Sequence, residues 1–119
     1  MRVMISQPMR DRTEKQIIDE RKKVIDKLRG FGWKVVDTLF KDNPEKKCNT
    51  TVYYLGKSID AISKVDAVLF MNGWDKARGC KIEHEVCLQY NIPTIYEYEL
   101  FEKDSKLLKA IYKKCQELS

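Results

Sequence analysis

The sequence has little of what metal and redox centres require. It contains one histidine, His84, and its four cysteines form no Cys-x-x-Cys pair, so the usual ligand spacing of a zinc site is missing. Neither the Gly-x-Gly-x-x-Gly pattern of dinucleotide-binding loops nor the P-loop pattern occurs. We therefore expect no metal and no redox cofactor, and we expect the cysteines to be free thiols in a reducing cytosol.

Long apolar runs and concentrated charge are also missing. No apolar run approaches the ~20 residues that a membrane-spanning helix needs, and the N-terminus enters a strand-like run without the pattern of a signal peptide. The net charge is +5, but the basic residues are scattered among acidic ones and form no arginine stripe. Because spread charge mainly serves solubility, we expect a cytoplasmic protein without membrane contact, and we disfavour a nucleic-acid polymer as its partner.

What the sequence does contain is a regular alternation of strand-like and helix-like segments. Short apolar runs predict strands over 2–5, 33–36, 67–71 and 94–96, and apolar residues at helical spacing separate them. Strands joined by helices imply right-handed crossovers and a parallel sheet covered on both faces. We therefore predict one domain over residues 1–119, an α/β three-layer sandwich of flavodoxin-like or Rossmann-like type with four or five strands.

Several local features of this arrangement are predicted as well. Thr13 and Gln16 form a capping-box pattern at the start of the first helix. The inner face of the third helix is expected to carry Ile82, Val86 and Tyr90. Residues 37–51 lack apolar periodicity and predict a long loop of the kind that closes over sites. A final helix is expected at Leu107, Leu108, Ile111 and Cys115.

In folds of this type ligands bind at the carboxyl ends of the strands, where the strand order reverses. This rule selects residues 6–12 after the first strand and 72–82 after the third. In the second loop, Gly79 would let a ligand approach the start of a helix, whose amides favour an anion. Glu83 follows about one turn later, and we expect the helix dipole with Arg78 and Lys81 to keep its carboxylate ionised. The alternative is that Glu83 only complements the dipole.

The first loop brings together hydroxyl, amide and guanidinium groups. Ser6, Gln7 and Arg10 could surround a phosphate or a sugar, although a plain turn with exposed arginines is an equal interpretation. Trp74 follows Gly73 at the predicted ligand edge and is the best candidate to stack on a base, with Tyr54 as another. His84 is rotated by about 100° from Glu83 around the helix, which favours a surface or supporting position.

Three stretches of the chain resemble the nucleoside 2-deoxyribosyltransferase-like superfamily, most closely its short uncharacterised members. They are residues 4–10, residues 54–60 continuing through Asp66 to Val68, and residues 73–83, and the resemblance covers roughly residues 2 to 97. The superfamily opens its third helix with Gly-x-x-x-Glu and places a proline ten residues later, as Gly79, Glu83 and Pro93 do here.

The resemblance implies cleavage of the N-glycosidic bond of a nucleoside or nucleotide. Glu83 is then the candidate nucleophile, and Arg10 falls where related nucleotide hydrolases contact a phosphate. Arg78 is a further candidate to hold sugar or phosphate oxygens, and a homo-oligomer is implied. Three positions depart from the superfamily pattern, namely Gln7, Ser58 and Ala77. They leave open a non-catalytic protein that binds or sequesters a nucleotide in the same pocket.

Overall fold

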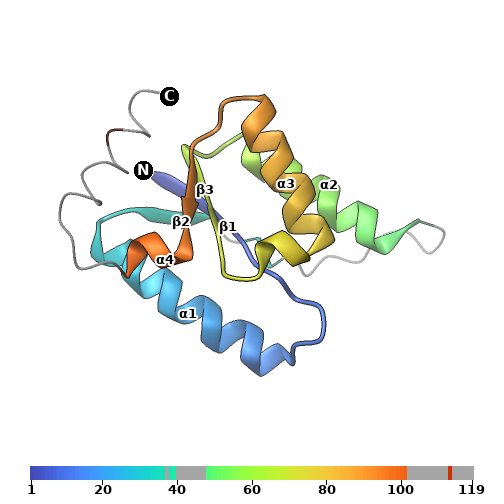
Figure 1. Cartoon of the computed structure of the whole chain (residues 1–119), viewed down its shortest axis with the longest axis horizontal. Helices are drawn as coiled ribbons and strands as arrows, with labels where there is room; N and C mark the ends of the chain where they lie inside the picture. Colours follow the sequence, from blue (N-terminus) through green and yellow to red (C-terminus); the bar gives the residue numbers. More distant parts are fainter. Residues whose placement is uncertain (37, 40–47, 102–112, 114–119) are drawn as a thin grey trace.

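The computed structural model describes residues 1–36, 38–39, 48–101 and 113 (Figure 1). Within them, four strands alternate with helices, as the sequence predicts. The elements are β1 (Arg2–Ser6), α1 (Glu14–Gly30), β2 (Lys34–Val36), α2 (Thr50–Ile62), β3 (Ala67–Phe70), the 3-10 turn η1 (Trp74–Lys76), α3 (Arg78–Gln89), β4 (Thr94–Tyr96) and α4 (Glu97–Leu100).

The four strands form one parallel sheet in the order β2-β1-β3-β4. The α/β sandwich predicted from the alternation is therefore confirmed. The chain moves from β1 outward to β2 and then returns to the other side of β1 for β3, so the strand order reverses between β1 and β3. Ser6 is paired in register with Phe70 at that point. The reversal therefore lies at the strands whose following loops were selected from the sequence.

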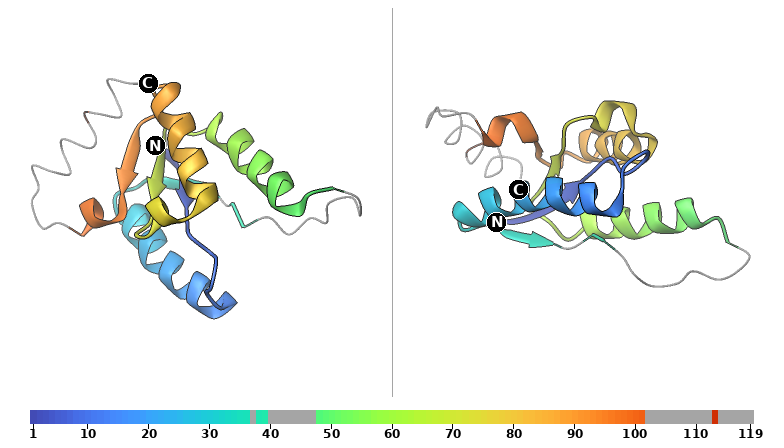
Figure 2. Two further views of the ribbon diagram at one scale, coloured as in Figure 1. Left: turned by 45° about the vertical axis from the view of Figure 1, so that its right-hand side comes forward. Right: turned by 90° about the horizontal axis from the view of Figure 1, so that it is seen from below.

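A layer of helices covers each face of the sheet. Successive side chains of a strand point to opposite faces, so alternate strand residues pack against different helices. Val3, Ile5 and Leu69 are fully buried in a cluster with Val24 and Leu28 of α1. On the other face lie Met4, Val68 and Phe70, packed with Ile62 of α2 and Cys87 of α3. Figures 1 and 2 show α1 beside α4, and α2 beside α3. The site described below lies on the face covered by α2 and α3.

The helix ends follow the predicted chemistry at α1. Thr13 accepts from the backbone N–H of Gln16 at 3.1 Å, and Gln16 accepts from the N–H of Thr13 at 2.9 Å, which completes the predicted capping box. The second helix begins within the predicted loop, because Asn49 accepts from the N–H of Val52 and caps α2.

The predicted inner face of α3 is confirmed at Val86, which packs against the core, and is wrong at Ile82 and Tyr90. Ile82 is 41% exposed and Tyr90 is 76% exposed, while the buried residues of the helix are Cys80, Glu83 and Cys87. The helix is rotated relative to the apolar stripe, because a hydrogen bond holds the polar side chain of Glu83 inside, and small thiols pack beside it. The short helix α4 was not predicted. The residues that predict the final helix lie outside the described residues, namely Leu107, Leu108, Ile111 and Cys115. The same holds for 37 and 40–47, which make up most of the predicted loop.

Candidate functional site

The site centres on Glu83, which α3 presents to the carboxyl end of β1. Ser6 is the last residue of β1, and its hydroxyl donates a hydrogen bond to Oε2 of Glu83. Both side chains are buried, with exposed fractions of 2% for Ser6 and 8% for Glu83. Two residues that are 77 positions apart in the sequence are therefore brought into direct contact at the reversal point of the strand order.

Burial governs the acidity of Glu83. Loss of water raises the pKa of the carboxyl group above its ordinary value, and hydrogen bonding by Ser6 and Ser58 lowers it in part. Arg78 and Lys81, which together with the helix dipole were expected to keep Glu83 ionised, are both exposed, and desolvation is the largest influence on its pKa. In the sequence, Ser58 of α2 stood out only because it departs from the superfamily pattern. In the structure its side chain hydrogen-bonds the carboxylate of Glu83.

Two buried thiols flank Glu83 on the same face of α3. Burial raises the pKa of Cys80 to about 11 and that of Cys87 to about 12, and the nearby charge of Glu83 adds to both shifts. A thiol must ionise to act as a nucleophile, so these groups are inert near neutral pH. The described cysteines, Cys48, Cys80 and Cys87, form no disulfide. The chemistry of this face therefore rests with Glu83.

An aromatic cluster adjoins the site and includes the predicted stacking residue Trp74. The ring of His84 stacks on Trp74 with centroids 4.0 Å apart, and the ring of Phe70 meets His84 edge-on at 4.9 Å. His84 Nε2 lies 2.7 Å from the hydroxyl of Tyr96, and burial lowers the pKa of the imidazole. Trp74 and His84 are both half-buried, so His84 supports Trp74 rather than standing free at the surface.

The residues of the loop after β1 have different placements. Gln7 is buried, and its amide turns towards α1, on the face opposite Glu83. Arg10 is exposed and makes no hydrogen bond or ion pair with the described residues. Arg12, which sequence reasoning passed over, donates to the carbonyl of Pro8 and pairs with Glu20 at 3.4 Å. Its charge lowers the pKa of Cys80, so Arg12 is the loop cation that acts on the site.

The start of α3 is exposed and open. Ala77 precedes the helix without a side-chain cap, and Arg78 is its exposed first residue. A Cβ added to Gly79 would meet nothing within 4 Å, so no packing in the described chain requires a glycine there. Tyr54 is half-buried on α2, one turn before Ser58, with its ring edge-on to Tyr53 at 5.3 Å.

Comparison with known proteins gives one match. The family model of DUF4406, a domain of unknown function, matches residues 1–96. The chain belongs to this family. No significant match exists among curated proteins or among solved structures. The matched range of the DUF4406 domain contains Ser6, Ser58 and Glu83, so the whole contact set around the carboxylate lies inside the family domain. The resemblance to deoxyribosyltransferases remains a prediction.

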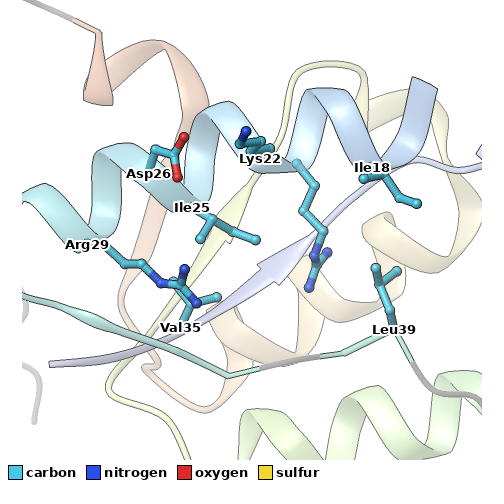
Figure 3. A pocket seen from close by; sticks show the side chains of 8 residues that line it. Ile18, Lys22, Ile25, Asp26, Arg29, Val35 and Leu39 are labelled. Carbon is cyan, nitrogen blue, oxygen red and sulfur yellow. The ribbon is translucent and has the colours of Figure 1, made fainter. Parts of the chain in front are cut away.

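A groove of about 390 Å³ lies elsewhere on this DUF4406 chain, on the other side of the sheet (Figure 3). None of the predicted site residues lines it, and its walls come from α1, β2 and the segment that follows β2. We place the candidate site at Glu83 because its buried carboxylate, held by hydroxyl groups where the strand order reverses, can react with a ligand. The residues that line the groove include no buried carboxylate of this kind.

Among residues 1–36, 38–39, 48–101 and 113, no three His, Cys, Asp or Glu side chains gather in a way that could hold a metal ion. Within the same residues, no helix has both the length and the apolar character needed to cross a membrane.

Replacing Glu83 by glutamine is expected to make the chain more stable near pH 8 and to change its stability less near pH 3.5. A carboxyl group whose folded-state pKa is raised stabilises the fold below its ordinary pKa of 4.5, and this contribution is lost as pH rises through the folded pKa. Glutamine does not ionise and still accepts from Ser6, so the variant avoids this loss. Urea unfolding at about pH 3.5 and about pH 8 measures the difference.

Glu85→Gln is the matched control, because Glu85 is exposed on the same helix. If Glu83→Gln changes stability equally at both pH values, burial of the charge at position 83 does not limit the stability of the fold.

Proposed function

We propose that this protein cleaves the N-glycosidic bond of a nucleoside or nucleotide, with Glu83 as the reacting carboxylate. The observation that carries the proposal is the buried, hydroxyl-bonded carboxylate of Glu83 at the point where the strand order reverses. In open α/β sheets this is the place where ligands bind, and a desolvated carboxylate there needs a positive charge to face it.

The reaction supplies that charge in its transition state. As the bond between C1′ and the base nitrogen breaks, its electron pair leaves with the base, and positive charge develops on the sugar as an oxocarbenium ion. A Glu83 oxygen then stabilises C1′ or bonds to it, and the departing base nitrogen takes up a proton from water. A water molecule adds its hydroxyl to C1′, either directly or by displacing the Glu83 ester, so the free sugar leaves and the carboxylate is restored. Few waters compete for the buried carboxylate, so its interaction with the developing cation is stronger than it would be in solvent.

Neighbouring groups have matching roles in this proposal. Ser6 and Ser58 stabilise the ionised form of Glu83 and orient its oxygens. Trp74, supported by His84 and Phe70, borders the same edge of the sheet and offers a surface for a base. The charge of Arg12 acts on Cys80, and its guanidinium lies beside Gly73 in the loop after β3, which makes it a further candidate to hold a sugar or phosphate oxygen.

A second function, nucleotide binding without turnover, is favoured by one specific observation. Burial raises the pKa of Glu83, and a carboxyl group that holds its proton donates a hydrogen bond to a ligand and does not attack it. A protein of this kind would sequester or sense the nucleotide in the same pocket.

A panel experiment separates the candidates. The protein is incubated with purine and pyrimidine nucleosides and their 5′-monophosphates, and free base is measured by chromatography. Release of base supports the proposed reaction. Tight binding by calorimetry without release supports the binding protein. Binding only to polymeric DNA or RNA, with steep salt dependence, contradicts both.

Replacing Gly79 by alanine is expected to stabilise the fold and to weaken ligand binding. Alanine is the better helix former by up to about 1 kcal/mol, and the added methyl meets nothing in the protein. A ligand that approaches the start of α3 would meet the methyl, and overpacking of this kind costs enough to raise Kd about tenfold or more. Urea unfolding and calorimetry, with the ligand identified in the panel, measure the two effects.

Gly56→Ala is the matched control, because Gly56 is an exposed glycine of α2 whose added methyl also meets nothing. It should stabilise the fold and leave Kd unchanged. Equal Kd values for both variants would mean that no ligand approaches Gly79.

A further inference from the structure

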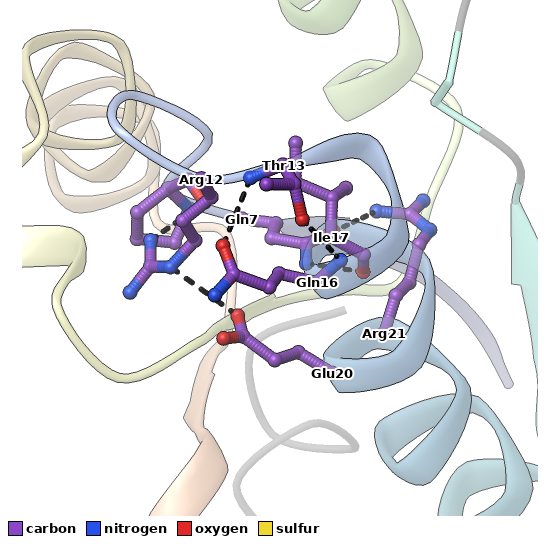
Figure 4. Close-up of polar contacts among 8 residues, drawn as sticks. Gln7, Arg12, Thr13, Gln16, Ile17, Glu20 and Arg21 are labelled. Atoms are coloured by element: carbon purple, nitrogen blue, oxygen red, sulfur yellow. Dashed lines mark hydrogen bonds and ion pairs between the residues drawn. The ribbon is translucent and has the colours of Figure 1, made fainter.

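A buried polar network lies on the face of the sheet opposite Glu83. Gln7 Nε2 donates to the carbonyl of Ile17 at 2.8 Å, and Arg21 Nη1 donates to Gln7 Oε1 at 3.3 Å (Figure 4). Arg21 Nη2 donates to Thr38 Oγ1 at 3.0 Å, and that hydroxyl donates to the carbonyl of Ile5 at 3.2 Å. The side chains of Gln7, Arg21 and Thr38 are all less than 10% exposed.

This network holds both neighbours of Ser6. Successive residues of a strand point to opposite faces, so Ile5 and Gln7 face α1 while Ser6 faces α3. The pairing of β1 with β2 ends at Met4 and Val36, and beyond it the Thr38 hydroxyl reaches the next carbonyl of β1. The carbonyl of Ser6 itself accepts from the N–H of Met71 at 3.0 Å. The backbone at Ser6 is therefore fixed from both sides.

We propose that Arg21 is a positioning residue, which acts through Gln7 and Thr38 to hold the Ser6 hydroxyl against Glu83. A serine side chain has a single rotatable bond to its oxygen, so the direction of its hydrogen bond depends on the position of its backbone. Loss of the network frees the end of β1 and weakens the contact with Glu83. The inference rests on the proposed function in taking Glu83 as the reacting group, although its test requires no substrate.

The test uses the acidity of Glu83 as a local readout in the full chain. Ser6 from β1 and Ser58 from α2 hydrogen-bond this carboxyl, and its charge in turn raises the pKa of the neighbouring thiols Cys80 and Cys87 on α3. Thr38 lies across the sheet, so a change there reaches Glu83 through the backbone of β1. Carbon NMR titration of the Glu83 carboxyl is carried out on the wild type, with Ser6→Ala as the reference for a lost contact.

Thr38→Val and Thr38→Ser form the matched pair. Valine has the shape of threonine but lacks the hydroxyl, so we expect the pKa of Glu83 to rise towards its value in Ser6→Ala, because the hydroxyl of Ser6 lowers it. Serine keeps the hydroxyl, and we expect the wild-type titration. Arg21→Lys, which reaches one partner at a time, should give an intermediate rise. If base release has been established, kcat should fall about tenfold in Thr38→Val with KM little changed.

Two results would overturn the inference. If Thr38→Val and Arg21→Lys lower the urea midpoint but leave the Glu83 titration unchanged while Ser6→Ala moves it, the network is only structural. If Ser6→Ala does not move the titration, Ser6 does not govern Glu83 and the inference fails as well. Absence of base release across the nucleoside panel is a separate result, and it would contradict the proposed reaction without affecting this titration.

Discussion

Glu83→Gln is expected to slow the release of base from the nucleoside or nucleotide by about 10³-fold, because the amide can neither attack C1′ nor carry the charge that stabilises an oxocarbenium ion. Glutamine has nearly the shape of glutamate and still accepts from Ser6, so the loss reports the charge and not the fold. The rate of base release under saturating substrate is measured by chromatography, and circular dichroism checks that the variant folds.

Glu85→Gln provides the control for this measurement as well. Glu85 is exposed, two residues along the same helix, and its carboxylate accepts from the side chain of Gln89, as glutamine could. Its variant should release base at the wild-type rate. Full activity in Glu83→Gln would remove Glu83 from the mechanism, and an equal loss in both variants would point to the total charge of α3.

Phe70→Ala is expected to lower the free energy of unfolding by about 3–5 kcal/mol, which is typical for truncation of a buried aromatic residue. Phe70 is fully buried, and its ring contacts Trp74, His84 and Tyr96. The cavity would therefore open directly beneath the aromatic cluster. Urea unfolding measures the loss, and fluorescence of the folded state in a Trp33→Phe background reports the surroundings of Trp74 alone.

Leu69→Ala is the matched control for Phe70→Ala. Leu69 is also fully buried in β3, but it faces α1, and its truncation should cost about 2–5 kcal/mol. Both variants should unfold at lower urea, and only Phe70→Ala should shift the emission of Trp74. A similar shift in Leu69→Ala would show that the two faces of the sheet do not pack independently.

The contact between Ser6 and Glu83 separates what the sequence predicts of the candidate site from what it does not. The loops after β1 and β3 follow from the alternation of strands and helices, and Gly79 and Glu83 are selected by their place in the second loop and by the resemblance to the deoxyribosyltransferase-like superfamily. The acidity of Glu83 depends on how completely neighbouring elements exclude water, which no local pattern encodes. For the same reason the sequence marked Ser58 only as a departure from the superfamily pattern. It also led us to select Arg10, and not Arg12, as the arginine that binds the ligand.

The buried face of α3 also shows what a local sequence pattern predicts and what only the packing decides. Its apolar stripe of Ile82, Val86 and Tyr90 predicts an inner face, yet of the three only Val86 packs against the core. The buried residues of the helix are Cys80, Glu83 and Cys87. The positions of apolar residues do not by themselves decide which face of such a helix is buried. In α3 the buried face includes Glu83, whose carboxylate accepts a hydrogen bond from Ser6.

The amino-acid sequence by itself determined the alternation of the four strands with helices, the parallel sheet, the capping of α1 and the positions of the loops after β1 and β3, because periodicity and turn chemistry are local properties. Only the tertiary structure decided that Glu83 is buried against Ser6, that His84 supports Trp74, and that Arg21, Gln7 and Thr38 fix the end of β1 from the opposite face. These features join residues far apart in the chain, and they exist only once packing has removed water and brought the partners together.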